Sequence, residues 1–389
     1  MRLNRRDLLR LSALGGGALA LGPAFWKEAY AAPARPGPSP YGAMSGSPDA
    51  NGIRLPAGFS SRFIAGSGRV VAGTGYTWHG APDGGACFPL PAGGWVYASN
   101  SELYDGGGAS AVRFDGGGAV VGAWRILANT QVNCAGGPTP WGTWLSCEEH
   151  SDGKVWECDP TRPSQGVARG ALGTFPHEAV AVDPVGRRLY LTEDSGSGRF
   201  YRFTPSAWPS LTAGTLQAAK VTGDPVAGTA TLSWVKCSAA SPASSQSSVA
   251  SKTTVFDGGE GCWYDSGVVY FTTKGDNRVW AHTPATGKLE VIYDDLSSTS
   301  PLTGVDNVTV SRSGDLYVAE DGGNMEICII TPGPNRVVAP FIRLVGHDSS
   351  EITGPAFSPD GRRLYFSSQR GVTGMDDGGM TFEVSGPFR

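Results

Sequence analysis

A loose internal repeat is the feature that most constrains how this chain can fold. Each unit has a short apolar segment, a Gly-containing turn, a second segment with Leu-Tyr or Val-Tyr, and an acidic or polar tip, and the longer units continue to a Thr-Pro. The clearest units span residues 177–205, 259–284, 305–332 and 352–371. Two looser units span residues 81–107 and 134–160. Units of this kind predict small antiparallel sheets that repeat along the chain.

The repeat predicts an all-β fold, a β-propeller with six blades. Equivalent positions such as Glu260, Asp306 and Gly354 are spaced by about 46 to 48 residues, which a β-sandwich, the alternative, rarely shows. The 57 glycines and a charged fraction of 17% also argue against long helices. The propeller is expected to span residues 51–389 as one domain, with a Ser/Ala-rich insertion near residues 237–252.

The first 31 residues are typical of a twin-arginine signal peptide. Arg5 and Arg6 precede an apolar run from Leu11 to Phe25 that is diluted by glycine and short for a membrane span. A retained membrane anchor is the alternative. Twin-arginine export carries folded proteins and is associated with cofactors loaded in the cytoplasm. We therefore expect an exported metalloprotein, in the periplasm, in the cell wall or outside the cell.

The mature chain is expected to begin with a flexible arm rich in Pro, Gly and Ser at residues 32–50. Loss of residues 1–31 removes five basic and two acidic residues, so the net charge changes from −4 to −7. This balance disfavours nucleic acid and anionic membranes as partners. We expect a monomer with no stable membrane insertion after the leader is removed.

Acidic residues recur at two places in the repeat. One set opens the first strand of a unit, and the other lies at the end of the second strand. Because the first strands of a propeller line its central channel, these carboxylates should converge, and converging carboxylates need cations such as Ca²⁺. The alternative is that they are turn acids in solvent, which is how Asp105, Asp115 and Asp360 are interpreted. The first-strand candidates are Glu178, Glu260 and Asp306, and the second-strand candidates are Glu102, Glu148, Asp194 and Glu320.

Cys134 departs from this oxygen pattern. It is one of seven cysteines, an odd number, so at least one thiol must stay unpaired or bind a ligand. A thiolate is a poor ligand for Ca²⁺ and a reasonable one for iron. Taken alone, Cys134 could equally form a disulfide with Cys147 or Cys158.

Several segments resemble the PhoX-type alkaline phosphatases, a family of exported propellers. The resemblance lies in Asn100-Ser101-Glu102, NCAGGPTPWGTWLSCEE (133–149), HEAVAVDP (177–184), LTED (191–194), GEGCWY (259–264), VDNVTVS (305–311) and EDGG (320–323). It implies a six-bladed propeller that hydrolyses phosphate monoesters of small metabolites at a cluster of Fe³⁺ and Ca²⁺. It further implies that Cys134 binds iron and that Glu178 and Glu260 bind iron or calcium. The remaining implied ligands, for calcium, are Glu102, Glu148, Asp194, Asp306 and Glu320.

The chain departs from this family at two motifs. The family's Arg-Pro-Glu-Gly is Gly-Gly-Glu-Gly at residues 258–261, so Gly258 stands where an arginine would contact phosphate. The family's Asn-His-Glu is Asn-Ser-Glu at residues 100–102. Arg278 or Arg370 could supply the missing cation. Two alternatives to a phosphatase follow: a calcium-binding propeller without phosphatase activity, and a lactonase-like ester hydrolase.

Overall fold

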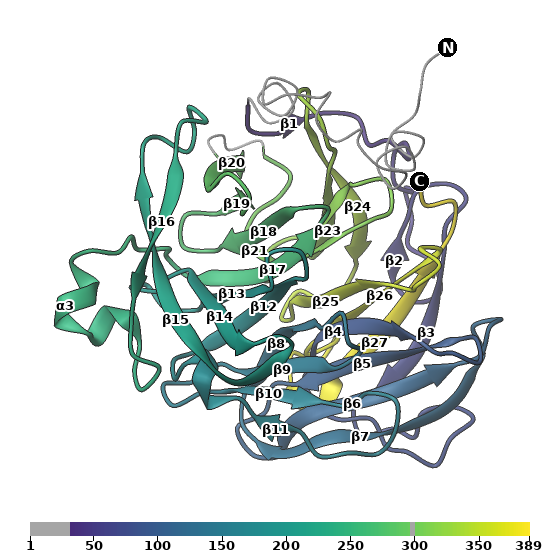
Figure 1. Ribbon diagram of the computed structural model, residues 1–389. Coiled ribbons are helices and arrows are strands. Elements are labelled where there is room, and N and C mark those ends of the chain that lie inside the picture. The colour runs from purple at the N-terminus through teal and green to yellow at the C-terminus, as the bar shows by residue number, and fades with distance from the viewer. Residues whose placement is uncertain (1–31, 296–299) are drawn as a thin grey trace.

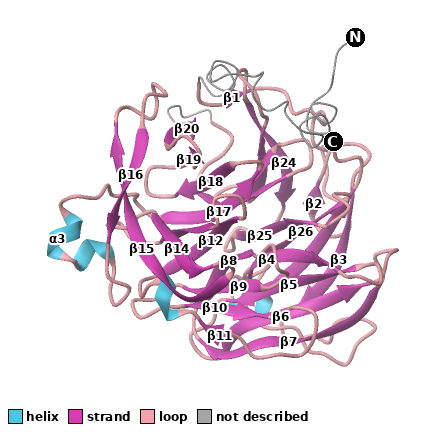
Figure 2. Cartoon of the chain, in the orientation of Figure 1, coloured by secondary structure: helices cyan, strands magenta, loops and turns pink. Residues whose placement is uncertain are grey.

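Strands make up most of the computed structural model, which describes residues 32–295 and 300–389. The leader expected at residues 1–31 lies outside the described residues. Figure 1 shows small sheets arranged around a common centre, and Figure 2 shows that the helical segments are short. None of the helices in the described ranges is long and apolar enough to cross a membrane.

The first two sheets are antiparallel meanders with strands in sequence order. The first contains β4 (Pro82–Pro89), β5 (Trp95–Ser101), β6 (Gly107–Phe114) and β7 (Val120–Thr130). The second contains β8 (Asn133–Pro138), β9 (Trp144–Glu148), β10 (Val155–Cys158) and β11 (Val167–Ala168), followed by η2 (Gly170–Leu172).

The next sheet has nine strands and consists of two meanders joined at their outer edges. The first meander is β12 (His177–Asp183), β13 (Arg188–Glu193), β14 (Tyr201–Ala207), β15 (Ser210–Thr222) and β16 (Thr231–Lys236). The second is β17 (Gly259–Asp265), β18 (Val268–Thr273), β19 (Arg278–Thr283) and β20 (Lys288–Asp294). Their outer edges are joined by the pairing of Thr231 with Lys288. Between them, the Ser/Ala-rich insertion forms η3 (Ala243–Ser245) and α3 (Ser247–Ala250).

Two further sheets include strands from the N-terminal part of the chain. One contains β21 (Val305–Val310), β22 (Leu316–Glu320), β23 (Glu326–Ile330) and β24 (Val337–Leu344), with β1 (Arg35–Pro36) and β2 (Ile53–Arg54) on its edge. The other contains β25 (Ile352–Phe357), β26 (Arg363–Ser368), η4 (Asp376–Gly378), β27 (Met380–Ser385) and β3 (Ser60–Gly66). Because β3 pairs with β27, the two ends of the propeller are joined in one sheet.

The innermost strands form a closed ring. Each contacts the next one around the centre, from β4 through β8, β12, β17 and β21 to β25, and β25 contacts β4 again. This closure, with meanders radiating outward, is a β-propeller, as the repeat predicted. Apolar side chains pack between neighbouring meanders; for example, the rings of Phe200 and Phe271 stack with centroids 4.1 Å apart.

Small residues allow the inner strands to approach closely. A Cβ added to Gly84 of β4 would lie 2.4 Å from Cα of Ala135 in β8, and one added to Gly261 would lie 2.6 Å from the backbone nitrogen of Val308. Where the ring closes, a Cβ on Gly354 would lie 2.8 Å from the carbonyl oxygen of Asp83. Contacts under 3 Å require displacement of the neighbouring backbone, so these positions favour glycine.

Part of the N-terminal segment 32–50, which the sequence predicts to be a flexible arm, pairs with a sheet. Arg35 and Pro36 pair in parallel with β24, and the buried Ala34 donates its N–H to the carbonyl oxygen of Ile292. An extended Pro/Gly-rich segment can satisfy its few backbone donors along an exposed sheet edge, which explains why it packs here.

All seven cysteines lie in the described ranges and are free thiols. Cys134 therefore forms no disulfide with Cys147 or Cys158, which removes the alternative left open by the sequence.

Candidate metal centre

Acidic side chains surround a cavity of about 220 Å³ at one end of the inner ring. Its walls carry six carboxylates, two cationic side chains and a thiol: Glu102, Glu149, Glu260, Asp306, Asp321, Glu351, Lys274, Arg370 and Cys134. With every group ionised, negative charge exceeds positive charge, so the cavity is suited to bind further cations.

Strand register explains why these residues meet. In six hairpins of the described chain, a residue of the first strand pairs with the last residue of the second strand. The residue that directly follows each member of this pair occupies an equivalent position in all six hairpins. A register shift follows in every first strand, so the same bulge recurs around the ring. Thr353, and not the Gly354 expected from the spacing, is equivalent to Asp306. The equivalent first-strand residues are Asp83, Cys134, Glu178, Glu260, Asp306 and Thr353. The residues that follow the second strands are Glu102, Glu149, Asp194, Lys274, Asp321 and Gln369.

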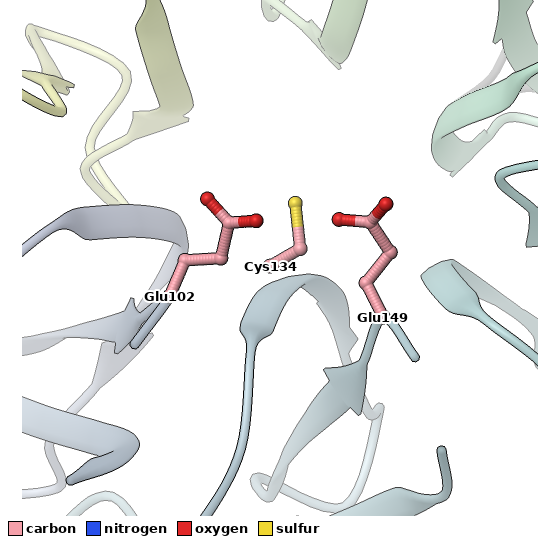
Figure 3. A group of neighbouring side chains, drawn as sticks. All are labelled: Glu102, Cys134 and Glu149. Carbon is pink, nitrogen blue, oxygen red and sulfur yellow. The ribbon is translucent and has the colours of Figure 1, made fainter. Parts of the chain in front are cut away.

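Cys134 lies between two carboxylates at the cavity wall. One potential ligand atom of each of Glu102, Cys134 and Glu149 lies within 4.8 Å of the others. Figure 3 shows the two carboxylates pointing toward the sulfur from opposite sides. Burial and then the charge of Glu102 raise the pKa of Glu149 to about 10, and burial with nearby Asp83 raises the pKa of the Cys134 thiol. Such an arrangement is unfavourable as three anions unless a cation binds.

A second group, Glu178, Glu260 and Asp306, is buried, with potential ligand atoms that also lie within 4.8 Å of one another. Burial and then Glu260 raise the pKa of Glu178 and of Asp306, while burial and Asp194 raise the pKa of Glu260 to about 8. The Oε2 atom of Glu178 is buried without a hydrogen-bond partner. A buried carboxylate oxygen in this state is the observation that most favours a bound cation.

Asn307 lies beneath this buried group. Its Nδ2 donates to Oδ1 of Asp306 at 2.8 Å and to Oε1 of Glu178 at 3.4 Å, while its Oδ1 accepts the N–H of Gly354 at 2.7 Å. Asn307 therefore orients two of the three carboxylates and connects them to a third inner strand.

The two cationic side chains of the cavity are already paired. Nζ of Lys274 lies 2.9 Å from Glu260, 3.2 Å from Asp194 and 3.5 Å from Asp321. Burial alone would lower the pKa of Lys274, but the carboxylates, Glu260 first, outweigh burial and raise it. Arg370 lies 2.6 Å from Glu351 and 4.0 Å from Glu102.

The cavity brings together most of the predicted residues. Glu102, Cys134, Glu260 and Asp306 line it, and Glu178 belongs to the buried group. Asp194 reaches it through its ion pair with Lys274.

Glu148 and Glu320 lie elsewhere, which corrects their predicted place in the channel. Oε2 of Glu148 accepts the N–H of Lys154, and Oε2 of Glu320 accepts the N–H of Glu326, six residues later in both cases. Each is the last residue of a second strand, and because side chains alternate along a strand it faces away from the cavity. The next residues, Glu149 and Asp321, occupy the cavity instead.

Glu320 belongs to a separate buried group with Glu326 and Cys328. Oε1 of Glu320 accepts the N–H of Thr303, and Oε1 of Glu326 lies 2.5 Å from Arg343. These contacts provide hydrogen-bond and ion-pair partners for the carboxylates of Glu320 and Glu326. The two carboxylates therefore stabilise their own sheet and need no metal ion.

Within the acid pairs Glu148-Glu149 and Glu320-Asp321, the sequence prediction chose the first acid, whereas the second lines the cavity. The prediction did not include Asp83, Glu351 or Asn307. Glu149 and Asp321 could have been found by counting strand alternation from Cys134 and Asp306. Asp83 precedes two glycines and looks like a turn residue, yet it is buried and equivalent to Cys134.

The donor set fits bound metal ions. A thiol between two carboxylates matches the ligands of iron, and an all-carboxylate group matches the oxygen ligands of Ca²⁺. The unpartnered Oε2 of Glu178 shows that the buried group is incomplete without a cation or another donor.

The sequence matches the alkaline phosphatase PhoX family over residues 106–155 and 150–371. The chain belongs to the PhoX family. A comparison with curated proteins found no match.

Solved structures are similar in fold. Pseudomonas fluorescens PhoX in complex with vanadate, described as a transition state analogue, is 17% identical with a TM-score of 0.66, covering 91% of this chain and 98% of that one. A gluconolactonase from Xanthomonas campestris is 14% identical with a TM-score of 0.51, covering 90% of this chain and 99% of that one. These likenesses confirm the propeller fold.

Gly258, where the chain departs from the PhoX pattern, has a left-handed backbone conformation and lies next to Lys274. Gly258 has a φ of +62° and a Cβ there would lie 3.3 Å from Cγ of Lys274. Of the two arginines considered as substitutes, Arg278 is paired with Asp276 and Asp294, and only Arg370 lines the cavity.

Proposed function

We propose that this protein is an exported metal-dependent phosphatase that hydrolyses phosphate monoesters of small metabolites in a six-bladed propeller. The observation that carries the proposal is Cys134 between Glu102 and Glu149, beside a second group of three buried carboxylates. Membership of the PhoX family supports the reaction class. The ring of inner strands and the six equivalent hairpins support the blade count.

Two ligand groups would hold the ions. Glu102, Cys134 and Glu149 would bind Fe³⁺, and Glu178, Glu260 and Asp306 would bind Ca²⁺ or share ions with the first group. When bound, such cations supply positive charge that stabilises the oxygens of a phosphoryl group. The chain's own contribution is to fix the ligands: Asn307 orients the buried carboxylates, and the recurring bulge directs first-strand side chains into the cavity.

The remaining parts of the proposal follow from the sequence. The leader directs twin-arginine export to the periplasm, the cell wall or the medium, and the mature protein is a monomer without nucleic-acid partners. These are tested by processing, fractionation and size-exclusion chromatography of the protein made in a bacterial host with an intact twin-arginine system.

The central test is elemental analysis of the mature protein, purified after native export without chelators, together with hydrolysis of p-nitrophenyl phosphate. We expect iron and calcium in the same chain, and we expect Cys134→Ser to lose the iron and most of the activity. Cys158→Ser, a buried thiol outside the cavity, is the matched control and should retain both. Calcium without iron in the wild type would contradict the assignment of Cys134.

Gly258 favours a second candidate, a metal-binding propeller of the same family that does not hydrolyse phosphomonoesters. Without a side chain at this position, the cavity lacks one bidentate anion contact. A lactonase-like ester hydrolase is the other form of this candidate. Parallel assays of the metal-loaded protein with p-nitrophenyl phosphate and with an aldonolactone distinguish them: lactone hydrolysis alone would replace the phosphatase proposal.

A further inference from the structure

Lys274 is held by three carboxylates from three neighbouring parts of the ring. Its Nζ lies 2.9 Å from Oε1 of Glu260, 3.2 Å from Oδ2 of Asp194 and 3.5 Å from Oδ2 of Asp321. An ammonium group has three donors and no acceptor, so three carboxylates can satisfy it fully. The lysine is therefore the centre of a small anionic site.

Lys274 occupies a position of the repeat at which the neighbouring hairpins carry acidic residues. Lys274 directly follows β18, and the equivalent residues of the hairpins before and after it are Asp194 and Asp321. The equivalent residues of two further hairpins are Glu102 and Glu149. A cationic side chain thus occupies a place that is acidic in its neighbours, and it bonds to the acids on both sides.

Backbone hydrogen bonds hold the main chain of Lys274, from which the side chain reaches the cavity. The N–H of Lys274 donates to the carbonyl oxygen of Gly258 at 2.7 Å, and the N–H of Gly275 donates to Asp257 at 3.1 Å. The lysine is 38% exposed and lines the cavity, whereas Glu260 is 3% exposed. The positive charge of the ammonium therefore lies next to one oxygen of this buried carboxylate and compensates part of its negative charge.

We propose that Lys274 is an internal counter-ion that takes the place of one divalent cation among Asp194, Glu260 and Asp321. The inference rests on the proposed function, because it concerns the number of ions in the same cavity. It assigns Asp194 and Asp321 to the lysine and leaves the metal ions to the groups around Cys134 and Glu178. The chain would therefore bind fewer divalent cations than the number of carboxylates in and around the cavity suggests.

The experiment compares the calcium content of the wild type with that of Lys274→Gln after dialysis against CaCl₂ and removal of excess salt. We expect one additional Ca²⁺ per chain in Lys274→Gln, with Lys274→Arg unchanged from wild type. Lys288→Gln is the matched control, because Lys288 also pairs with a buried carboxylate, Glu290 at 2.6 Å, but lies outside the cavity. An unchanged or reduced calcium content in folded Lys274→Gln would overturn the proposal.

A second variant covers the case in which Lys274→Gln does not fold. The double variant Asp194→Asn, Asp321→Asn should keep the metal content of the wild type, because these carboxylates bind the lysine rather than an ion. Loss of one or more ions from the double variant would overturn the proposal.

The result that would contradict the proposed function differs from the result that would contradict the counter-ion role of Lys274. A wild type without bound metal, or without phosphatase activity, would contradict that function and leave the comparison between wild type and Lys274→Gln informative. Metal in the wild type with no gain in Lys274→Gln would contradict the counter-ion alone.

Discussion

Asn100 holds the backbone of Cys134 in place. Its Nδ2 donates to the carbonyl oxygen of Cys134 at 3.0 Å and to that of Ala135 at 2.7 Å, and its Oδ1 accepts from Nε1 of Trp144 and Oγ of Ser146, both at 2.8 Å. The amide is fully buried, and it connects the first hairpin to the second at the point where the thiol enters the cavity. Asn100 is thus a positioning residue for the candidate metal centre.

We expect Asn100→Ala to lower the free energy of unfolding by about 3 kcal/mol, because it leaves several buried donors and acceptors without partners. Urea unfolding followed by tryptophan fluorescence measures this. Asn51→Ala, which removes a single hydrogen bond to Ser61, should change stability by less than about 1 kcal/mol. Equal effects in the two variants would contradict the role assigned to Asn100.

Gly84 is needed for the close approach of two inner strands. A Cβ at this position would lie 2.4 Å from Cα of Ala135, so Gly84→Ala must displace a neighbouring backbone. We expect a loss of about 3 kcal/mol in the free energy of unfolding. Gly75→Ala is the control, because nothing lies within 4 Å of its Cβ position. Equal stability of the two variants would contradict the close packing of β4 against β8 at Gly84.

Glu148 and Glu149 are adjacent acids with opposite expected roles. Glu149 faces Cys134, so Glu149→Gln should weaken binding of the ion at that group by at least about tenfold, measured by competition with a chelator. Glu148 accepts the N–H groups of Gln131 and Lys154, so Glu148→Gln should leave ion binding unchanged and lower the free energy of unfolding by about 1 to 2 kcal/mol. The reverse pattern would show that Glu148 is the ligand, as first predicted.

The sequence was sufficient to predict the ring and its acidic centre. Glu178, Glu260 and Asp306 each lie in the first apolar segment of a repeat unit, and alignment of these units makes the three residues equivalent. It was not sufficient to choose within acid pairs such as Glu148-Glu149, because both members are buried or half-buried and only the exact strand end decides which one faces the cavity.

Two other features depend on contacts between distant residues. Asp83 looks like a turn acid until the pairing of Pro82 with Ser101 makes it equivalent to Cys134. Lys274, which directly follows β18, stands where the equivalent residues of the neighbouring hairpins are acidic. Its three carboxylate partners come from positions 194, 260 and 321, and only the closed ring brings them together.

Removal of metal should make stability depend on pH in a definite direction. In the folded, metal-free protein, burial and neighbouring carboxylates raise the pKa of Glu149 to about 10, that of Glu260 to about 8 and that of Glu351 to about 7. In the unfolded chain these groups titrate near their ordinary pKa of about 4.3. Between these values the folded state binds more protons than the unfolded state, so stability must fall as pH rises.

We therefore expect the melting temperature of the chelated protein to be several degrees lower at pH 9 than at pH 6. The metal-loaded protein should lose this dependence or reverse it, because cations favour the ionised carboxylates. Differential scanning calorimetry of both forms in matched buffers measures the effect, and Glu149→Gln should make the chelated protein less sensitive to pH. A chelated protein that becomes more stable between pH 6 and pH 9 would show that the carboxylates of the cavity are ionised and compensated without metal.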